Sequence, residues 1–170
     1  SNKFIRYRHS PINPHSLSHD NVRAIYEQPD GSLWVGTHGG GLNRLNRTTG
    51  TFQRYMKNSK DSRSLSTDNV SSILQSSDGL LWVGTDGHGL SRRNATTGVF
   101  THFRNLAGDS TSLSGNYVWA LLEDHKKNLW VGTGGAGLRR FDPQTQRFTR
   151  YRPIPGDSTA LASATILCMT

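Results

Sequence analysis

The chain has 170 residues, and its 33% hydrophobic and 9% aromatic content suits one domain with a thin core while excluding a collagen-like or wholly disordered chain. Its 20 lysines and arginines outnumber its 12 aspartates and glutamates, and the net charge of +8 permits an anionic partner. The single cysteine, Cys168, excludes an intramolecular disulfide framework and a thiolate metal cluster. No apolar run approaches the roughly 18 residues that a membrane-spanning helix requires.

A repeat with a period of 48 residues organises the sequence. The segment Leu-Trp-Val-Gly-Thr at 33–37 returns at 81–85 and at 129–133 without insertion. A Ser-Leu-Ser triplet recurs with the same offset at 16–18, 64–66 and 112–114, with Ala-Leu-Ala at 160–162. A fixed period of this length predicts one supersecondary unit per repeat.

Each repeat predicts four short strands separated by turn residues. In the middle repeat we expect strands at 70–74, 81–85, 90–94 and 99–103, because apolar and β-branched runs alternate there with Gly, Asn, Asp and Thr clusters. Four antiparallel strands recurring at this spacing are typical of a propeller blade, whose faces are covered by its neighbours. The fold class predicted is therefore all-β, a partial β-propeller of three complete four-stranded antiparallel blades.

The blades are predicted to occupy 21–55, 69–103 and 117–151. Residues 1–20 are expected to supply the outer strand of a preceding blade and a connecting loop, and residues 160–170 the first strand of a following blade. A large indole and a glycine at fixed strand positions are expected to fill the space between neighbouring sheets. These structural positions are Trp34, Trp82, Trp130, Gly36, Gly84 and Gly132.

The chain holds too few repeats for a closed ring, since closed propellers typically use about four to eight blades. An unpaired strand at each end would recruit a partner. We therefore expect a homo-oligomer, or a dimer that shares strands between chains.

The repeat resembles that of the two-component regulator propeller family. The resemblance rests on Asp-Gly-x-Leu-Trp-Val-Gly-Thr followed by a glycine-rich turn and Leu, and then on Thr-Gly-x-Phe-x-x-Tyr or Phe. Departures include Lys126-Lys127 in place of Asp-Gly, and Arg93 where Leu45 and Phe141 stand in the other copies. The resemblance implies the extracytoplasmic, periplasmic sensor region of a hybrid histidine kinase or related protein. It also implies a small-molecule ligand, often a saccharide, with any membrane attachment supplied by other segments of a longer parent protein.

Positions that differ among the three copies at one mouth of the propeller are the candidate ligand contacts. In a blade, the interblade connection and the second hairpin turn emerge on the same face, so residues from both are expected to converge. Aromatic rings there suit sugar stacking, and an arginine suits an anionic substituent, although divergence at an exposed rim is the alternative. The candidates are Arg23, Ser71, Trp119, Tyr117, His38, Asp86 and His88.

Catalytic, metal and nucleic-acid sites receive little support from the sequence. The spacing of His38, Asp86 and His88 matches no known ligand motif, so no metal and no cofactor is predicted. Asp61, Asp109 and Asp157 recur at one position, which indicates a structural turn. The basic residues form no compact patch with aromatic residues between them, so nucleic-acid binding is not expected.

Three hypotheses for the function follow. The leading one is a non-catalytic sensor fragment of a signalling receptor that binds a small molecule, in particular a saccharide. The second is a scaffold for protein interaction or assembly, and the third is a fragment of a propeller lyase or glycosidase.

Overall fold

The computed structural model describes residues 4–170, and twelve strands form three separate four-stranded antiparallel sheets. Blade 1 consists of β1 (Val22–Glu27), β2 (Leu33–Thr37), β3 (Gly41–Asn46) and β4 (Thr51–Tyr55). Blade 2 consists of β5 (Val70–Gln75), β6 (Leu81–Thr85), β7 (Leu90–Arg93) and β8 (Phe100–Phe103). Blade 3 consists of β9 (Val118–Glu123), β10 (Leu129–Thr133), β11 (Leu138–Asp142) and β12 (Arg147–Tyr151).

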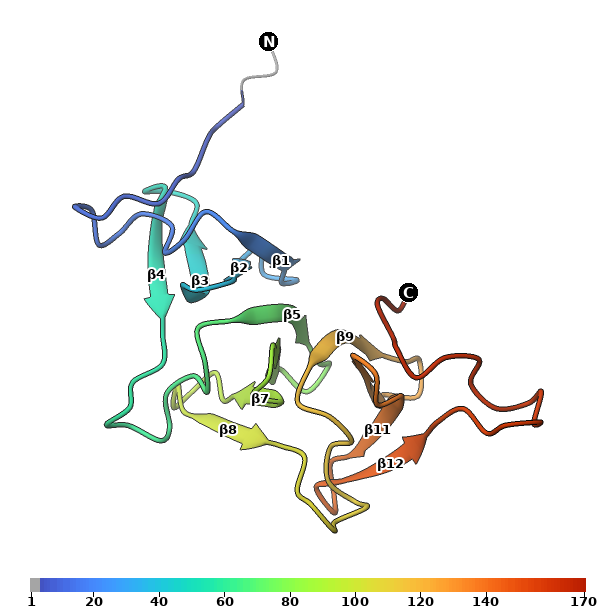
Figure 1. Ribbon diagram of the computed structural model, residues 1–170. Helices are drawn as coiled ribbons and strands as arrows, with labels where there is room; N and C mark the ends of the chain where they lie inside the picture. The colour runs from blue at the N-terminus through green and yellow to red at the C-terminus, as the bar shows by residue number, and fades with distance from the viewer. Residues whose placement is uncertain (1–3) are drawn as a thin grey trace.

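The blades follow one another along an open arc (Figure 1). Strand order within each sheet follows the sequence, and β5 contacts both β1 and β9, so the first strands of the blades lie side by side. The fourth strands β4, β8 and β12 lie at the periphery (Figure 1). Residues 4–170 contain no helix, and therefore no helix that could span a membrane. The predicted three-bladed propeller is confirmed as an open one.

The repeated tryptophans fill the space between blades, as predicted. Trp34 and Trp82 are each 2% exposed. The guanidinium carbon of Arg93, from blade 2, lies 5.7 Å from the ring centre of Trp34, and the ring of Phe141, from blade 3, lies 5.0 Å from that of Trp82. Arg93 therefore replaces the apolar residue of the other copies by stacking its planar cation on an indole.

Trp130 belongs to the last complete blade and is only half-buried. Its ring packs on Tyr151 of its own sheet at 5.2 Å, and its Nε1–H donates to the Asp124 carboxylate at 2.8 Å. This hydrogen bond holds the pKa of Asp124 well below its usual value. The contrast with Trp82 shows how much of the burial of an indole comes from the neighbouring sheet.

The repeated glycines admit the first strand of the next blade. A Cβ placed on Gly84 would lie 2.8 Å from both Cγ1 and the carbonyl oxygen of Val118. A Cβ on Gly132 would lie 2.6 Å from Cγ2 of Ile166. Gly36 faces Val70 in the same way, so the absence of a side chain at this position lets neighbouring sheets approach closely.

Each interblade loop folds along the outer strand of a blade. One backbone hydrogen bond recurs in each blade. It runs from the N–H of Phe52 to the carbonyl oxygen of His15, from that of Phe100 to Arg63, and from that of Phe148 to Thr111. The leucine of each Ser-Leu-Ser triplet enters the core, where Leu65 is 2% exposed. The carboxylates of Asp61, Asp109 and Asp157 accept the backbone N–H groups of Arg63, Thr111 and Thr159. The predicted structural role of these recurring aspartates is confirmed.

In each blade, a different side chain lies within hydrogen-bonding distance of backbone carbonyl oxygens in the interblade loop. In blade 1, Arg54 donates to the carbonyl oxygens of Asn13 and Ser16. In blade 2, His102 Nε2 lies 3.3 Å from the carbonyl oxygen of Ser62, and in blade 3 the buried Arg139 donates to that of Ser110. The outer loops are thus held by polar contacts that vary between copies.

His102 should make the stability of the protein depend on pH. Burial lowers its pKa from 6.5, so the folded state favours the neutral ring. The unfolded chain then takes up the proton more readily as the pH falls through 6.5 and below, and stability is lost there. We expect the urea midpoint to fall more between about pH 7.5 and about pH 5.5 in the wild type than in His102→Gln. Equal falls in the two proteins would contradict this role for His102.

The extra strand predicted at each end does not form. Within the described residues, 4–20 contain only an isolated bridge between His9 and Leu17, and 160–170 contain no strand. A strand needs a second strand alongside to satisfy its backbone groups, and neither end segment has one from its own blade. A role for these segments as strands of neighbouring blades therefore stays a prediction.

The end segments nevertheless lie where neighbouring blades would place them. The ring of Tyr7 meets that of Phe52 edge-on at 5.4 Å, much as Phe103 meets Phe148 at 5.9 Å. Ile166 packs on Gly132, and its N–H donates to the carbonyl oxygen of Thr133 at 3.1 Å. Side-chain packing at both ends, together with backbone hydrogen bonds at the C-terminal end, thus positions these segments without strand pairing.

Candidate functional site

A β-bulge occurs at the start of the first strand of every blade. The register shifts between Val22 and Ala24, between Val70 and Ser72, and between Val118 and Ala120. The extra residues are three of the predicted ligand contacts, Arg23, Ser71 and Trp119. A bulge redirects the side chain of its extra residue. The side chain at this divergent position of the repeat therefore does not follow the alternating directions of the other side chains in the strand.

Trp119 is fixed at the junction of blades 2 and 3. Its Nε1–H donates to Oδ1 of Asp86 at 2.9 Å, and Asp86 lies directly after β6 in the second turn of blade 2. A Cβ on Gly134 would lie 2.8 Å from two carbons of the indole. Gly134 stands where the other copies have His38 and Asp86, so this glycine makes room for the ring. The indole remains 36% exposed.

Tyr117 lies beside this junction and is 53% exposed. Its ring is 3.8 Å from the position that a Cβ on Gly87 would take, and Gly87 has a φ of +83°. The carbonyl oxygen of Tyr117 also accepts the backbone N–H of Gly134 at 2.9 Å. Two exposed aromatic rings from blade 3 therefore rest on glycines of the hairpin turns, with Asp86 as their polar neighbour.

Other predicted residues are engaged elsewhere or lie apart. The Ser71 hydroxyl donates to the carbonyl oxygen of Val118, which occupies it in the contact between β5 and β9. Arg23 is exposed on β1 and is separated from Trp119 by β5. The structure thus brings Trp119 and Asp86 together, with Tyr117 beside them, and does not bring Arg23 to the same point.

The two predicted histidines occupy separate places. The backbone N–H of His38 donates to the carbonyl oxygen of Asn21 within blade 1, and an isolated bridge to Asn69 places His38 beside the start of blade 2. His88 is half-buried and its Nδ1 has no partner among the described residues. No group of three His, Cys, Asp or Glu side chains within residues 4–170 is placed to hold a metal ion.

The shape of the mouth also depends on contacts that divergence alone did not reveal. Gly134 lies against the ring of Trp119, and Gly87 lies against that of Tyr117. One sequence feature could have indicated the contact between Trp119 and Gly134. Only the third copy has a large aromatic residue at the first of these positions, and it is also the copy with glycine at the second. The structure thus places two exposed aromatic side chains, Trp119 and Tyr117, beside one carboxylate, Asp86.

Three segments of the chain, 16–39, 64–87 and 112–135, match the two component regulator propeller family. Among solved structures, the extracellular domain of a protein proposed to be a hybrid two component system from B. thetaiotaomicron is 29% identical with a TM-score of 0.71. That of a proposed one component system from the same organism is 24% identical with a TM-score of 0.66. Virginiamycin B lyase from Staphylococcus aureus, at 16% identity and a TM-score of 0.59, shares the fold.

These matches cover most of the present chain and little of the other proteins. The two B. thetaiotaomicron matches each cover 84% of this chain, but 18% and 20% of the respective structures. The lyase match covers 82% of this chain and 43% of the lyase. No curated protein sequence matches the chain.

Proposed function

Because this chain is built from two-component regulator propeller repeats, we propose that it belongs to the ligand-sensing region of an extracytoplasmic receptor in a two-component-type signalling protein. Its ligand is a small saccharide, bound without chemical change. Binding biases the conformation of a signalling domain elsewhere in the parent protein. The periplasm is the proposed compartment, which accords with the extracellular origin of the similar B. thetaiotaomicron domain.

The pair of exposed rings at Trp119 and Tyr117 is the observation that carries this proposal. A sugar ring presents an apolar face of C–H groups and an edge of hydroxyls, so it needs a fixed aromatic surface with a hydrogen-bond acceptor beside it. Trp119 is held by Asp86 and Gly134, and one carboxylate oxygen of Asp86 accepts the indole N–H. The second carboxylate oxygen can accept a sugar hydroxyl.

The predicted mouth residues favour binding over hydrolysis. Glycoside hydrolysis uses two carboxyl groups about 5 to 10 Å apart, whereas Asp86 is the one carboxylate among these residues. The lyase resemblance concerns the fold, since 16% of the residues are identical. A scaffold role remains the alternative in which the same rings contact a protein.

Calorimetric titration with pools of short neutral oligosaccharides tests the proposal. We expect saturable heat from one glycan class, and an affinity about tenfold lower or worse for Trp119→Ala, because a central aromatic anchor is removed. Phe4→Ala is the matched control, since Phe4 is 97% exposed and lies at the far end of the chain. A folded wild type that gives no heat with any pool would contradict saccharide sensing and favour the scaffold. Turnover abolished by Asp86→Asn would instead favour the enzyme.

We further propose that the chain self-associates through the uncovered side of blade 3. There Trp130, Leu138, Tyr151 and Ile154 line a hollow of about 450 Å³, in the place where blades 1 and 2 receive a neighbouring sheet. A second copy is the proposed occupant, because blade 1 carries the complementary repeat face. Light scattering that shows a monomer at micromolar concentration would defeat this proposal.

A further inference from the structure

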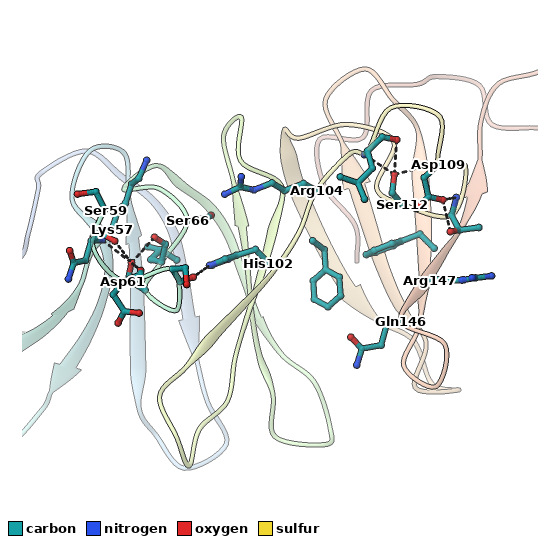
Figure 2. A pocket seen from close by; sticks show the side chains of 18 of the residues that line it. Lys57, Ser59, Asp61, Ser66, His102, Arg104, Asp109, Ser112, Gln146 and Arg147 are labelled. Atoms are coloured by element: carbon teal, nitrogen blue, oxygen red, sulfur yellow. Dashed lines mark hydrogen bonds between the residues drawn. The ribbon is translucent and has the colours of Figure 1, made fainter.

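A second hollow lies on the outer rim, far along the blade from the mouth. It has a volume of about 900 Å³ and follows β8, between the loop at 57–66 and the start of β12 at Arg147 (Figure 2). The residues at 57–66 come from the connection of blades 1 and 2, whereas those at 145–148 belong to blade 3. We call this hollow, with walls formed by Lys57, Arg104 and Arg147, the rim groove.

The positive groups of the rim groove are free, whereas its carboxylates are engaged. Lys57, Arg104 and Arg147 are exposed, and within residues 4–170 their side-chain nitrogens make no hydrogen bond or ion pair. Oδ1 of Asp61 accepts the backbone N–H of Arg63 at 3.0 Å. Oδ1 of Asp109 accepts both the N–H and the hydroxyl of Thr111, at 2.8 and 2.6 Å. Arg147 also helps to lower the pKa of Asp109, so both carboxylates stay ionised. The groove therefore has a small net positive charge, with three cationic side chains whose N–H groups are free to donate to a ligand.

The floor of the rim groove is apolar. Leu65 and Phe148 are buried beneath it, Phe103 is half-buried, and Leu106 is 58% exposed. His102 lies between them with Nδ1 2.9 Å from the Ser91 hydroxyl, and its burial favours the neutral ring. A ligand must therefore match the cations at the walls and the exposed apolar side chain of Leu106.

We infer that the rim groove is a docking site for an acidic polypeptide segment that carries apolar side chains between its carboxylates. The guanidinium groups of Arg104 and Arg147 match carboxylates in a two-pronged geometry. Exposed Leu106 provides a contact for an apolar side chain.

An anionic saccharide fits the same charges less well. Sugars bind to exposed aromatic faces, whereas the rings of Phe103 and Phe148 pack edge to face at 5.9 Å, and Phe148 is only 5% exposed. The rim groove uses none of the mouth residues, so a partner could occupy it while the mouth remains accessible. The inference therefore stands independently of saccharide binding.

Fluorescence anisotropy with a labelled peptide of alternating Glu and Leu tests this inference on the full chain. We expect saturable binding that weakens as salt is added, since exposed charges are screened. Arg104→Glu combined with Arg147→Glu should raise the dissociation constant at least about tenfold. The matched control combines Arg6→Glu with Lys126→Glu, which makes the same change in net charge at exposed positions outside the groove.

Three results would overturn the inference. They are the absence of binding to the wild type, equal weakening in the groove and control variants, and tighter binding of a sulfated oligosaccharide than of the acidic peptide. Arg104→Gln with Arg147→Gln provides a milder variant if charge reversal impairs folding, and circular dichroism verifies the fold of each protein. A peptide of alternating Lys and Leu should not bind.

Discussion

Replacing Trp82 by alanine is expected to lower the free energy of unfolding by about 3 to 5 kcal/mol, the usual cost of removing a large buried aromatic side chain. Trp82 is 2% exposed and packs against Phe103 of its own blade and Phe141 of the next, at 5.8 and 5.0 Å. Its Nε1–H also donates to the hydroxyl of Ser76 at 2.9 Å. The substitution would open a cavity between two sheets and leave this hydroxyl without its donor.

Trp130→Ala is the matched control for this prediction. Trp130 occupies the same position one repeat later but is only half-buried, because no complete sheet follows blade 3. We expect urea denaturation to show a clearly smaller loss for Trp130→Ala than for Trp82→Ala. Equal losses would mean that the indoles stabilise only their own sheets, contrary to the packing between blades described above.

Gly84→Ala should be the second most damaging substitution. The added Cβ would lie 2.8 Å from the carbonyl oxygen of Val118, and this backbone cannot move away easily because β9 is paired with β10 and packed against β5 and β6. Overpacking of this kind costs about 1 to 3 kcal/mol.

The equivalent change at Gly132 separates crowding from the loss of glycine itself. There the new methyl group would meet Ile166 at 2.6 Å, and Ile166 belongs to an end segment without strand pairing. That segment can shift, so Gly132→Ala is expected to cost less than Gly84→Ala in the same urea experiment. A larger loss at Gly132 would contradict the assigned contacts.

Most of the fold could be predicted from the sequence because the same residue types recur at the same spacing in three copies, and each copy forms the same kind of sheet. The recurrence of Trp82 and Gly84 at a fixed spacing indicated both the strand that carries them and the neighbouring sheet that covers them. The extra strands at the ends could not be judged in this way. Tyr7 and Ile166 follow the side-chain pattern of a strand, whereas strand pairing depends on partner backbone that the repeat pattern does not supply.

The mouth was predicted less completely than the fold. Divergence among copies located Arg23, Ser71 and Trp119 at one position, and the structure shows this position to be a bulge. The contact between Trp119 and Asp86 joins side chains that each occur in one copy only. Such a pair leaves no periodic signal, and the rim groove, formed by Arg104 and Arg147 from different blades, leaves none either.

Trp119, held by Asp86 and Gly134, forms the proposed ligand-binding surface. NMR observation of the indole N–H resonances tests it directly, because the protein has four tryptophans in distinct surroundings. On titration with the oligosaccharide pool that gives calorimetric heat, we expect the resonance of Trp119 to shift while those of buried Trp34 and Trp82 stay in place. Binding that leaves the Trp119 resonance unchanged, or that shifts only that of Trp130, would place the ligand elsewhere and contradict the proposed binding surface.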